Sequence, residues 1–207
     1  MSIFSKLFGK KQTDTEGARV GGMEDFMTLI RVYYQAVIAS QLGISNINLL
    51  PDMAVFKRTL KVPTQNNKLG VAEKARCRKM LMEIYGLSES FFKEIDNSVK
   101  KNCKTMNDIK TYLFMFQGFS QDLIMVVGNL MQWKFRIPGF FKKTMWSMTE
   151  KTVHDIFTKT NWKDDGVRKT CGNIRQYQHA LHYSESWITE YVYNIVMLAK
   201  KEPKPKS

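Results

Sequence analysis

The chain has 207 residues, enough for one large domain or two small ones, and its hydrophobic content of 43% excludes global disorder. It carries 32 Lys and Arg against 19 Asp and Glu, a formal net charge of +13. A charge excess of this size favours an acidic partner, which would be a nucleic-acid backbone, an anionic membrane surface or an acidic protein. No motif in the sequence selects one of the three.

The first eight residues form a short amphipathic arm. Its large apolar side chains share one helical face and are Ile3, Phe4, Leu7 and Phe8. The lysines around and after them are Lys6, Lys10 and Lys11. Residues 9–22 are polar and glycine-rich, which predicts a flexible tether. Such an arm can lie in an anionic membrane interface or dock in a partner's groove, and the alternative is that it folds back on the body.

From Met23 onward, apolar residues recur at spacings of three and four, which predicts an all-α fold. We expect a single domain over residues 23–200, a bundle of six or seven helices, followed by a disordered basic tail over 201–207. The expected helices cover about 23–42, 51–62, 68–85, 88–102, 105–134, 140–160 and 167–200. Residues 53–62 stay ambiguous, because their apolar positions also fit a strand.

Several boundaries carry recognisable helix signals. Gly43 and Gly86 are suited to end helices, and Pro51 is suited to a first turn. Ser88 can cap the helix that follows it. Thr105 with Asp108 three residues later resembles a capping box, with Asp in place of the usual Glu or Gln.

The helix over about 106–134 is apolar on nearly all sides, so we expect it to be central and surrounded by other helices. Polar residues within it, among them Asp122, argue against a membrane span. Gly118 and Gly128 lie on its narrow polar strip. The strip favours the close approach of a neighbouring helix or a solvent-facing side, and the alternative is the lining of a ligand cleft. The last helix, 167–200, would be long, with a break near 183–186 as the alternative.

Cys77, Cys103 and Cys171 are an odd number of cysteines without paired spacing. This pattern predicts reduced thiols in a cytoplasmic protein rather than a disulfide framework. We also expect no secretory signal, because Lys6 interrupts the apolar residues of the first eight and no small-residue cleavage site follows.

Candidate catalytic groups are sparse. His179, His182 and Glu185 share one side of a helix, but His154 would lie too far along a neighbouring helix to close a metal site. If the helices over 140–160 and 167–200 form an antiparallel hairpin, Cys171 lies near His154. A cysteine beside a histidine can become a thiol nucleophile, although no orienting acid can be named. We therefore expect no metal and no cofactor, and an enzyme using His154 and Cys171 is the third hypothesis.

The strongest candidate site is a basic patch on the 68–85 helix. Its cations are Lys74, Arg76, Arg78 and Lys79. They repel one another unless anions offset them, and in the sequence only Glu73 is close. The patch predicts a contact with phosphate or with an acidic protein, and the alternative is a solvated helix face.

These observations favour a non-enzymatic, cytoplasmic interaction or assembly protein. It would dock on an acidic protein complex or an anionic membrane face through the basic patch and the arm. The alternative is a nucleic-acid-binding protein that uses the same cations. A helix-turn-helix over 68–85 and 88–102 would fit that alternative, but its second helix carries the acids Glu89, Glu94 and Asp96.

Overall fold

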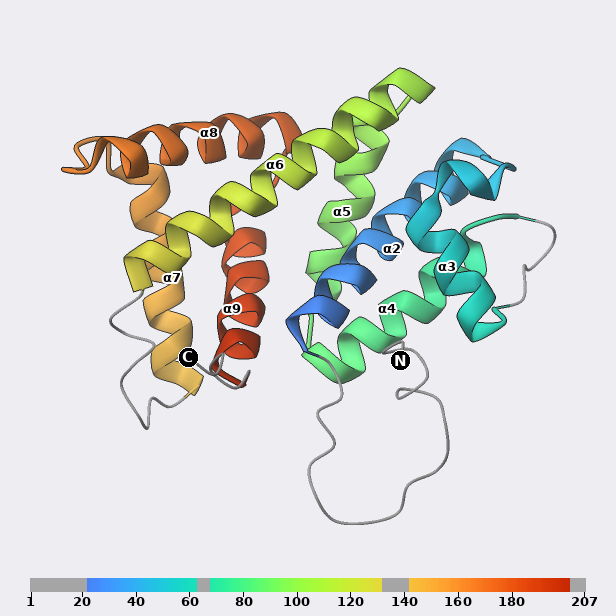
Figure 1. The fold of residues 1–207 in the computed structure, drawn as a ribbon, viewed down its shortest axis with the longest axis horizontal. Coiled ribbons are helices and arrows are strands. Elements are labelled where there is room, and N and C mark those ends of the chain that lie inside the picture. The colour runs from blue at the N-terminus through green and yellow to red at the C-terminus, as the bar shows by residue number, and fades with distance from the viewer. Residues whose placement is uncertain (1–21, 63–67, 132–141, 202–207) are drawn as a thin grey trace, which may run out of the picture. The chain divides into compact units, whose positions relative to one another are not determined.

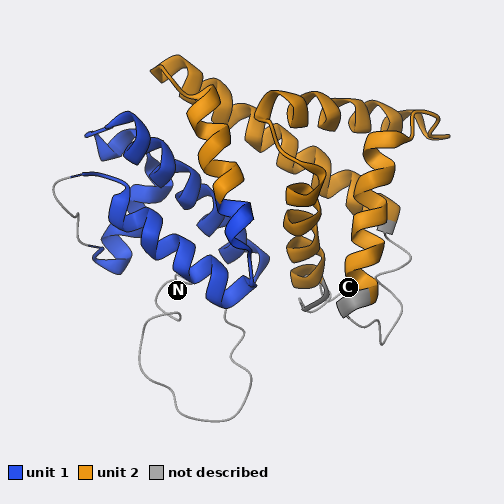
Figure 2. Ribbon diagram, turned by 180° about the vertical axis from the view of Figure 1, so that it is seen from behind, with its two compact units in different colours: residues 1–92 blue, residues 93–207 orange. Residues whose placement is uncertain are grey.

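The structure is a computed structural model of the chain and describes residues 22–62, 68–131 and 142–201. The described residues form an all-α protein, as predicted (Figure 1). The chain divides into two compact units, Met1–Phe92 and Lys93–Ser207, where we expected one domain (Figure 2). The predicted arm, its tether up to residue 21 and the tail from residue 202 lie outside the described residues.

The first unit is built around one buried helix. Its elements are α2 (Met23–Leu42), the 3-10 turn η1 (Ile47–Leu49), α3 (Pro51–Leu60) and α4 (Val71–Tyr85). Both α3 and α4 pack on α2. The ambiguous 53–62 segment is helical through Leu60, with Met53 and Phe56 fully buried. Gly43 and Gly86 adopt left-handed conformations at the ends of α2 and α4, as the sequence predicts.

A close backbone contact fixes the start of α4 against α2. Gly70, just before α4, has φ +91°, a conformation that favours glycine. A Cβ at this position would collide with the carbonyl oxygen of Ala36 and lie 2.9 Å from the Ala39 Cβ. The absence of a side chain at Gly70 therefore lets α4 lie directly on the α2 backbone.

The second unit contains most of α5 (Glu89–Asn102) together with four further helices. These are α6 (Met106–Met131), α7 (Lys142–Thr158), α8 (Asp165–Leu181) and α9 (Glu185–Lys201). α6 packs mainly on α8, and α7 mainly on α9. The core holds an aromatic stack in which the ring centroids of Tyr183 and Trp187 are 3.9 Å apart. The hydroxyl of Tyr112 lies 2.9 Å from that of Tyr183 and 2.8 Å from Ser98 Oγ, so the buried phenols are hydrogen-bonded.

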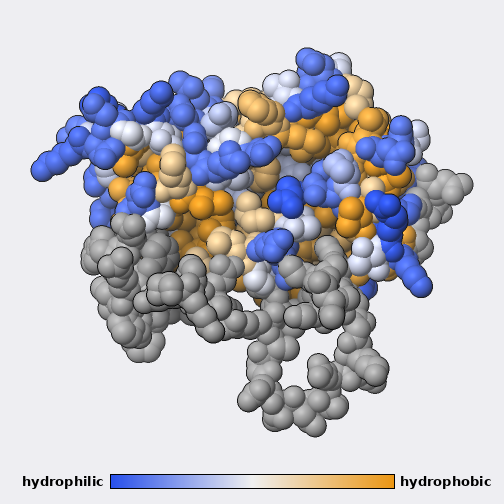
Figure 3. All heavy atoms as spheres, viewed as in Figure 1, coloured by the Kyte–Doolittle hydropathy of each residue, from blue (hydrophilic) through white to orange (hydrophobic). Residues whose placement is uncertain are grey.

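Two expectations about the long helices need correction. The predicted 167–200 helix is two helices, because His182 turns into a left-handed conformation (φ 58°) and Ser184 caps α9 through the Trp187 N–H at 3.1 Å. We also expected other helices to surround the helix that corresponds to α6. Not all of its apolar side chains are buried, because Phe114 is 74% exposed and Met125 is 51% exposed. Figure 3 shows hydrophobic residues reaching the surface between hydrophilic ones.

Gly118 confirms the expected close helix approach. A Cβ there would lie 2.8 Å from the Tyr177 hydroxyl of α8, whereas a Cβ at Gly128 would meet nothing within 4 Å. Among the described helices, none combines the length and the apolar character that crossing a membrane would require.

Candidate functional site

Helix α4 carries the basic patch on the side away from the core of the first unit. Cys77 and Leu81 are fully buried, while Arg76 and Lys79 are exposed. Lys74 and Arg78 are partly covered and lie at the border between the two faces. The helix is therefore amphipathic as predicted, with its cations at the surface.

Beside this patch the structure has an open hollow of about 590 Å³, which we call the α4 hollow. Three cations of the patch line it: Lys74, Arg78 and Lys79. Its apolar lining comes from α4 as well: Val71, Ala75 and Met82. The remaining lining residues are Ser40 at the end of α2 and Glu83. The hollow thus combines apolar contact area with positive charge on one helix.

We did not predict the apolar lining of the α4 hollow, which is formed by Val71, Ala75 and Met82 and which we call its apolar seam. Residues 71, 75 and 82 stand at spacings of four and seven, a period that brings them to one side of a helix. This spacing can be read from the sequence. The same fifteen residues also contain a stronger apolar pattern, that of the buried residues Cys77, Met80 and Leu81, which hides it. α4 therefore has two apolar faces, and one of them is not used by the core.

Arg78 and Lys79 have acidic neighbours, and only the spacing of four between Lys79 and Glu83 could be read from the sequence. Arg78 forms an ion pair with Glu89 at the start of α5, and its guanidinium lies 5.2 Å from the centre of the Phe92 ring. Lys79 Nζ is 3.7 Å from Glu83 Oε1, one helical turn away. Arg78 therefore contributes to the packing of the first unit as well as to its surface charge.

We expected the charge of Glu73 to offset the cations of the patch, and it does not. Its side chain is fully buried, and its Oε2 accepts a hydrogen bond of 3.0 Å from the Gly70 N–H. Its Oε1 lies 3.7 Å from Lys57 Nζ of α3. The carboxylate thus caps α4 and joins it to α3, in the interior of the first unit.

The cysteines are free and buried, in agreement with the predicted absence of a disulfide framework. Burial raises the pKa of the Cys103 thiol to about 12 and also raises the pKa values of Cys77 and Cys171. The thiolate is the nucleophilic form, so these environments oppose the activation that a catalytic cysteine needs.

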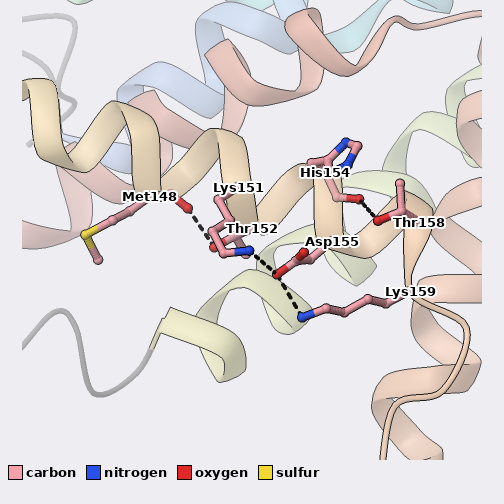
Figure 4. A network of polar contacts seen from close by, with 7 residues as sticks. All are labelled: Met148, Lys151, Thr152, His154, Asp155, Thr158 and Lys159. Atoms are coloured by element: carbon pink, nitrogen blue, oxygen red, sulfur yellow. Dashed lines mark hydrogen bonds and ion pairs between the residues drawn. The ribbon is translucent and has the colours of Figure 1, made fainter.

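His154 lies on α7 in an exposed polar network rather than in a pocket with a cysteine. Its Nδ1 is 3.3 Å from Glu185 Oε2 at the start of α9. At the next position, Asp155 Oδ2 lies 3.0 Å from Lys159 Nζ and 3.5 Å from Lys151 Nζ (Figure 4). The partner of His154 is therefore a carboxylate of α9, and the predicted pairing with Cys171 of α8 receives no support.

Within the described ranges, no group of three or more His, Cys, Asp or Glu side chains could hold a metal ion. His182 terminates α8 with its backbone, while His179 lies in the last turn of that helix. The site that the described residues do offer is the cationic, partly apolar α4 hollow.

The described residues define an all-α protein with a cationic, partly apolar hollow on one helix. The chain belongs to the family described as Domain of unknown function (DUF8491), whose model matches residues 1–207. No curated protein and no solved structure matches the chain.

Proposed function

We propose that this protein is a non-enzymatic interaction module that docks on an acidic partner protein through the α4 hollow. The observation that supports this is the combination, on one helix, of an apolar seam and the cations Lys74, Arg78 and Lys79. A partner helix with acidic and apolar residues at matching spacings would complement both features.

Two details favour a protein over a nucleic acid as this partner. The lining of the hollow includes no aromatic residue for base stacking. Apolar contact area is useful against a partner helix and of little use against phosphates.

In this proposal the amphipathic arm is a second contact. Its apolar side chains would insert into a partner's groove or into the interface of an anionic membrane, with Lys6, Lys10 and Lys11 adding attraction. Eight residues bind a membrane weakly alone, so the arm and the basic surface would act together. The proposed location is the cytoplasm, either in a protein assembly or peripherally at a membrane.

The test compares probes of different classes with the full chain. A synthetic amphipathic peptide with Glu on one face and Leu on the other should bind, with an affinity that falls only moderately as salt is raised, because apolar contacts remain. Duplex DNA of equal charge should bind more weakly and lose its affinity steeply with salt. Tighter, salt-resistant binding of the DNA would favour the nucleic-acid alternative and contradict the proposal.

A further inference from the structure

A second hollow, of about 640 Å³, lies in the first unit around the end of α3. We call it the α3 hollow. Its charged lining consists of Lys57, Arg58 and Lys61. Ser45 and Asn48 add polar groups, and apolar side chains complete the wall, including Ile47 and Leu69. The lining described for it holds three cations and no acid, which distinguishes it from the α4 hollow.

The charges of the α3 hollow are only partly balanced within the protein. Lys57 lies 3.7 Å from the buried Glu73. No carboxylate of the described residues forms an ion pair with Arg58 or Lys61. Arg58 Nε donates to the Ala54 carbonyl at 3.3 Å, which leaves the terminal nitrogens of its guanidinium for a ligand.

All three cations stand at the C-terminal end of α3. Cations in the last turn of a helix interact favourably with its dipole, which accounts for Lys57 and Arg58. Lys61 is the C-cap of α3, and its left-handed conformation (φ 51°) is the one that ends α8 at His182 as well. The conformation therefore belongs to the helix end, and what bears on a ligand is that the Lys61 side chain lines the hollow beside Lys57 and Arg58.

We infer that the α3 hollow binds a phosphomonoester that carries an apolar substituent. A phosphomonoester has close to two negative charges at neutral pH, which matches a site with three cations better than a single carboxylate does. Arg58 can bind phosphate oxygens through its fork, and Lys57 and Lys61 supply further charge. The volume of about 640 Å³ exceeds the need of a bare phosphate, and the apolar wall would contact the substituent. This chemistry occurs both in soluble phosphomonoesters and in lipid headgroups.

Calorimetry on the full chain with phenyl phosphate, inorganic phosphate and phenol tests the ligand class. Phenyl phosphate should bind most tightly, inorganic phosphate more weakly and phenol not measurably. Sedimentation with phosphatidylcholine vesicles, with and without phosphatidic acid, separates the two sources. Binding to the acidic vesicles that Lys61→Gly weakens assigns the lipid headgroup, because the arm and the net charge would bind such vesicles equally in both proteins. Absence of saturable binding to phenyl phosphate and to the acidic vesicles would overturn the inference.

The variant Lys61→Gly gives a sharp test because it removes the charge and suits the left-handed backbone. It should raise the melting temperature while weakening phenyl phosphate or vesicle binding roughly tenfold or more, the loss of one charge-assisted contact. His182→Gly is the matched control, since His182 has φ 58° at the end of α8 in the other unit. It should raise the melting temperature and leave binding unchanged. Equal binding by Lys61→Gly and wild type would overturn the inference, whatever the outcome for the α4 hollow.

Discussion

Gly70 and Glu73 are the residues on which the position of α4 depends. Gly70 allows backbone contact with α2, and the buried Glu73 carboxylate binds the Gly70 N–H and faces Lys57. The sequence placed Glu73 beside the patch cations because it lies one position from Lys74. On a helix, adjacent positions point about 100° apart, and the packing of α4 on α2 turned Glu73 inward.

Substituting Gly70 by Ala should destabilise the protein strongly. The left-handed backbone and the collision with the α2 backbone together predict a loss of about 3 kcal/mol in the free energy of unfolding. Gly86→Ala is the control, because Gly86 has φ +69° but a Cβ there would meet nothing within 4 Å. It should cost about 1 kcal/mol. Urea denaturation of both variants checks this, and equal losses would contradict the close-contact account.

The three cysteines should react with a thiol reagent only after unfolding. Burial raises the pKa of each thiol, and the Sγ of Cys77 also donates to the Leu29 carbonyl at 3.0 Å. Mass measurement after labelling should show no rapid modification of the native protein and three modified thiols in denaturant. Rapid native labelling of Cys171 would instead revive the hypothesis of a reactive thiol.

At the scale of helices and turns, most boundaries were predictable because they rest on local chemistry. The predicted capping box of α6 is confirmed: Asp108 Oδ2 accepts from the Thr105 N–H at 2.8 Å, and Thr105 Oγ1 accepts from the Asp108 N–H at 3.2 Å. Ser88 caps α5 through the Phe91 N–H at 3.3 Å, also as predicted. These contacts span three residues, so the sequence alone determines them.

The division of 167–200 into α8 and α9 was harder to predict because part of its stabilisation is not local. Ser184 is held by Glu94 of α5, whose carboxylate accepts from the Ser184 N–H at 2.9 Å and from its hydroxyl at 2.7 Å. The sequence offered the break only as an alternative, since neither glycine nor proline marks it. A contact across ninety positions carries no sequence pattern of its own.

The Asp108 cap predicts a specific acid sensitivity. Hydrogen bonds from the Thr105 backbone and side chain and from the Lys104 backbone lower the pKa of Asp108. A folded-state pKa below the unfolded one contributes stability above about pH 4, and this contribution disappears as the pH falls through the folded-state pKa. Wild type should therefore be more stable than Asp108→Asn at neutral pH, and the difference should vanish in acid.

Thermal unfolding across this pH range measures that difference. Glu150→Gln removes one charge from an exposed position on α7 and serves as the control. It should not reproduce the pH-dependent difference. A constant offset between wild type and Asp108→Asn at every pH would show that the charge of the cap is unimportant.

For the whole molecule, the proposals rest on the charge excess, and the structure locates part of it on the walls of two hollows. The α4 hollow could be predicted only in part. Its cations were visible as a cluster, but Ser40 at the end of α2 and Glu89, the partner of Arg78, come beside them only through the folding of the first unit. The position of a helix follows from local sequence patterns, whereas the residues that other elements bring beside its surface follow from tertiary packing.

Deleting residues 1–11 tests the role of the arm. The described fold begins with α2 at Met23, so the melting temperature should change little. Association with anionic vesicles or with a larger complex should be lost. If the deletion abolishes vesicle binding, and added salt weakens that binding in the full chain, the arm binds a membrane. If the deletion abolishes complex formation, and the complex of the full chain tolerates salt, the arm binds a protein groove. Full retention of both would remove the arm from the account.

The central claim is that the cations of α4, and not the net charge alone, bind the acidic partner. The most direct measurement compares two variants that lose the same three charges. One replaces Lys74, Arg76 and Lys79 by Gln and keeps Arg78, which packs on Phe92. The other replaces the exposed lysines Lys110, Lys163 and Lys169 of the second unit.

Fluorescence titration with the acidic amphipathic peptide should show at least a roughly tenfold weaker affinity for the α4 variant, as expected for three lost charge contacts. The variant of the second unit should bind within about twofold of wild type, because its charges lie outside the α4 hollow. Both variants should keep the wild-type melting temperature. Equal weakening in the two would contradict the claim, since it would show that the peptide responds to total charge rather than to the α4 hollow.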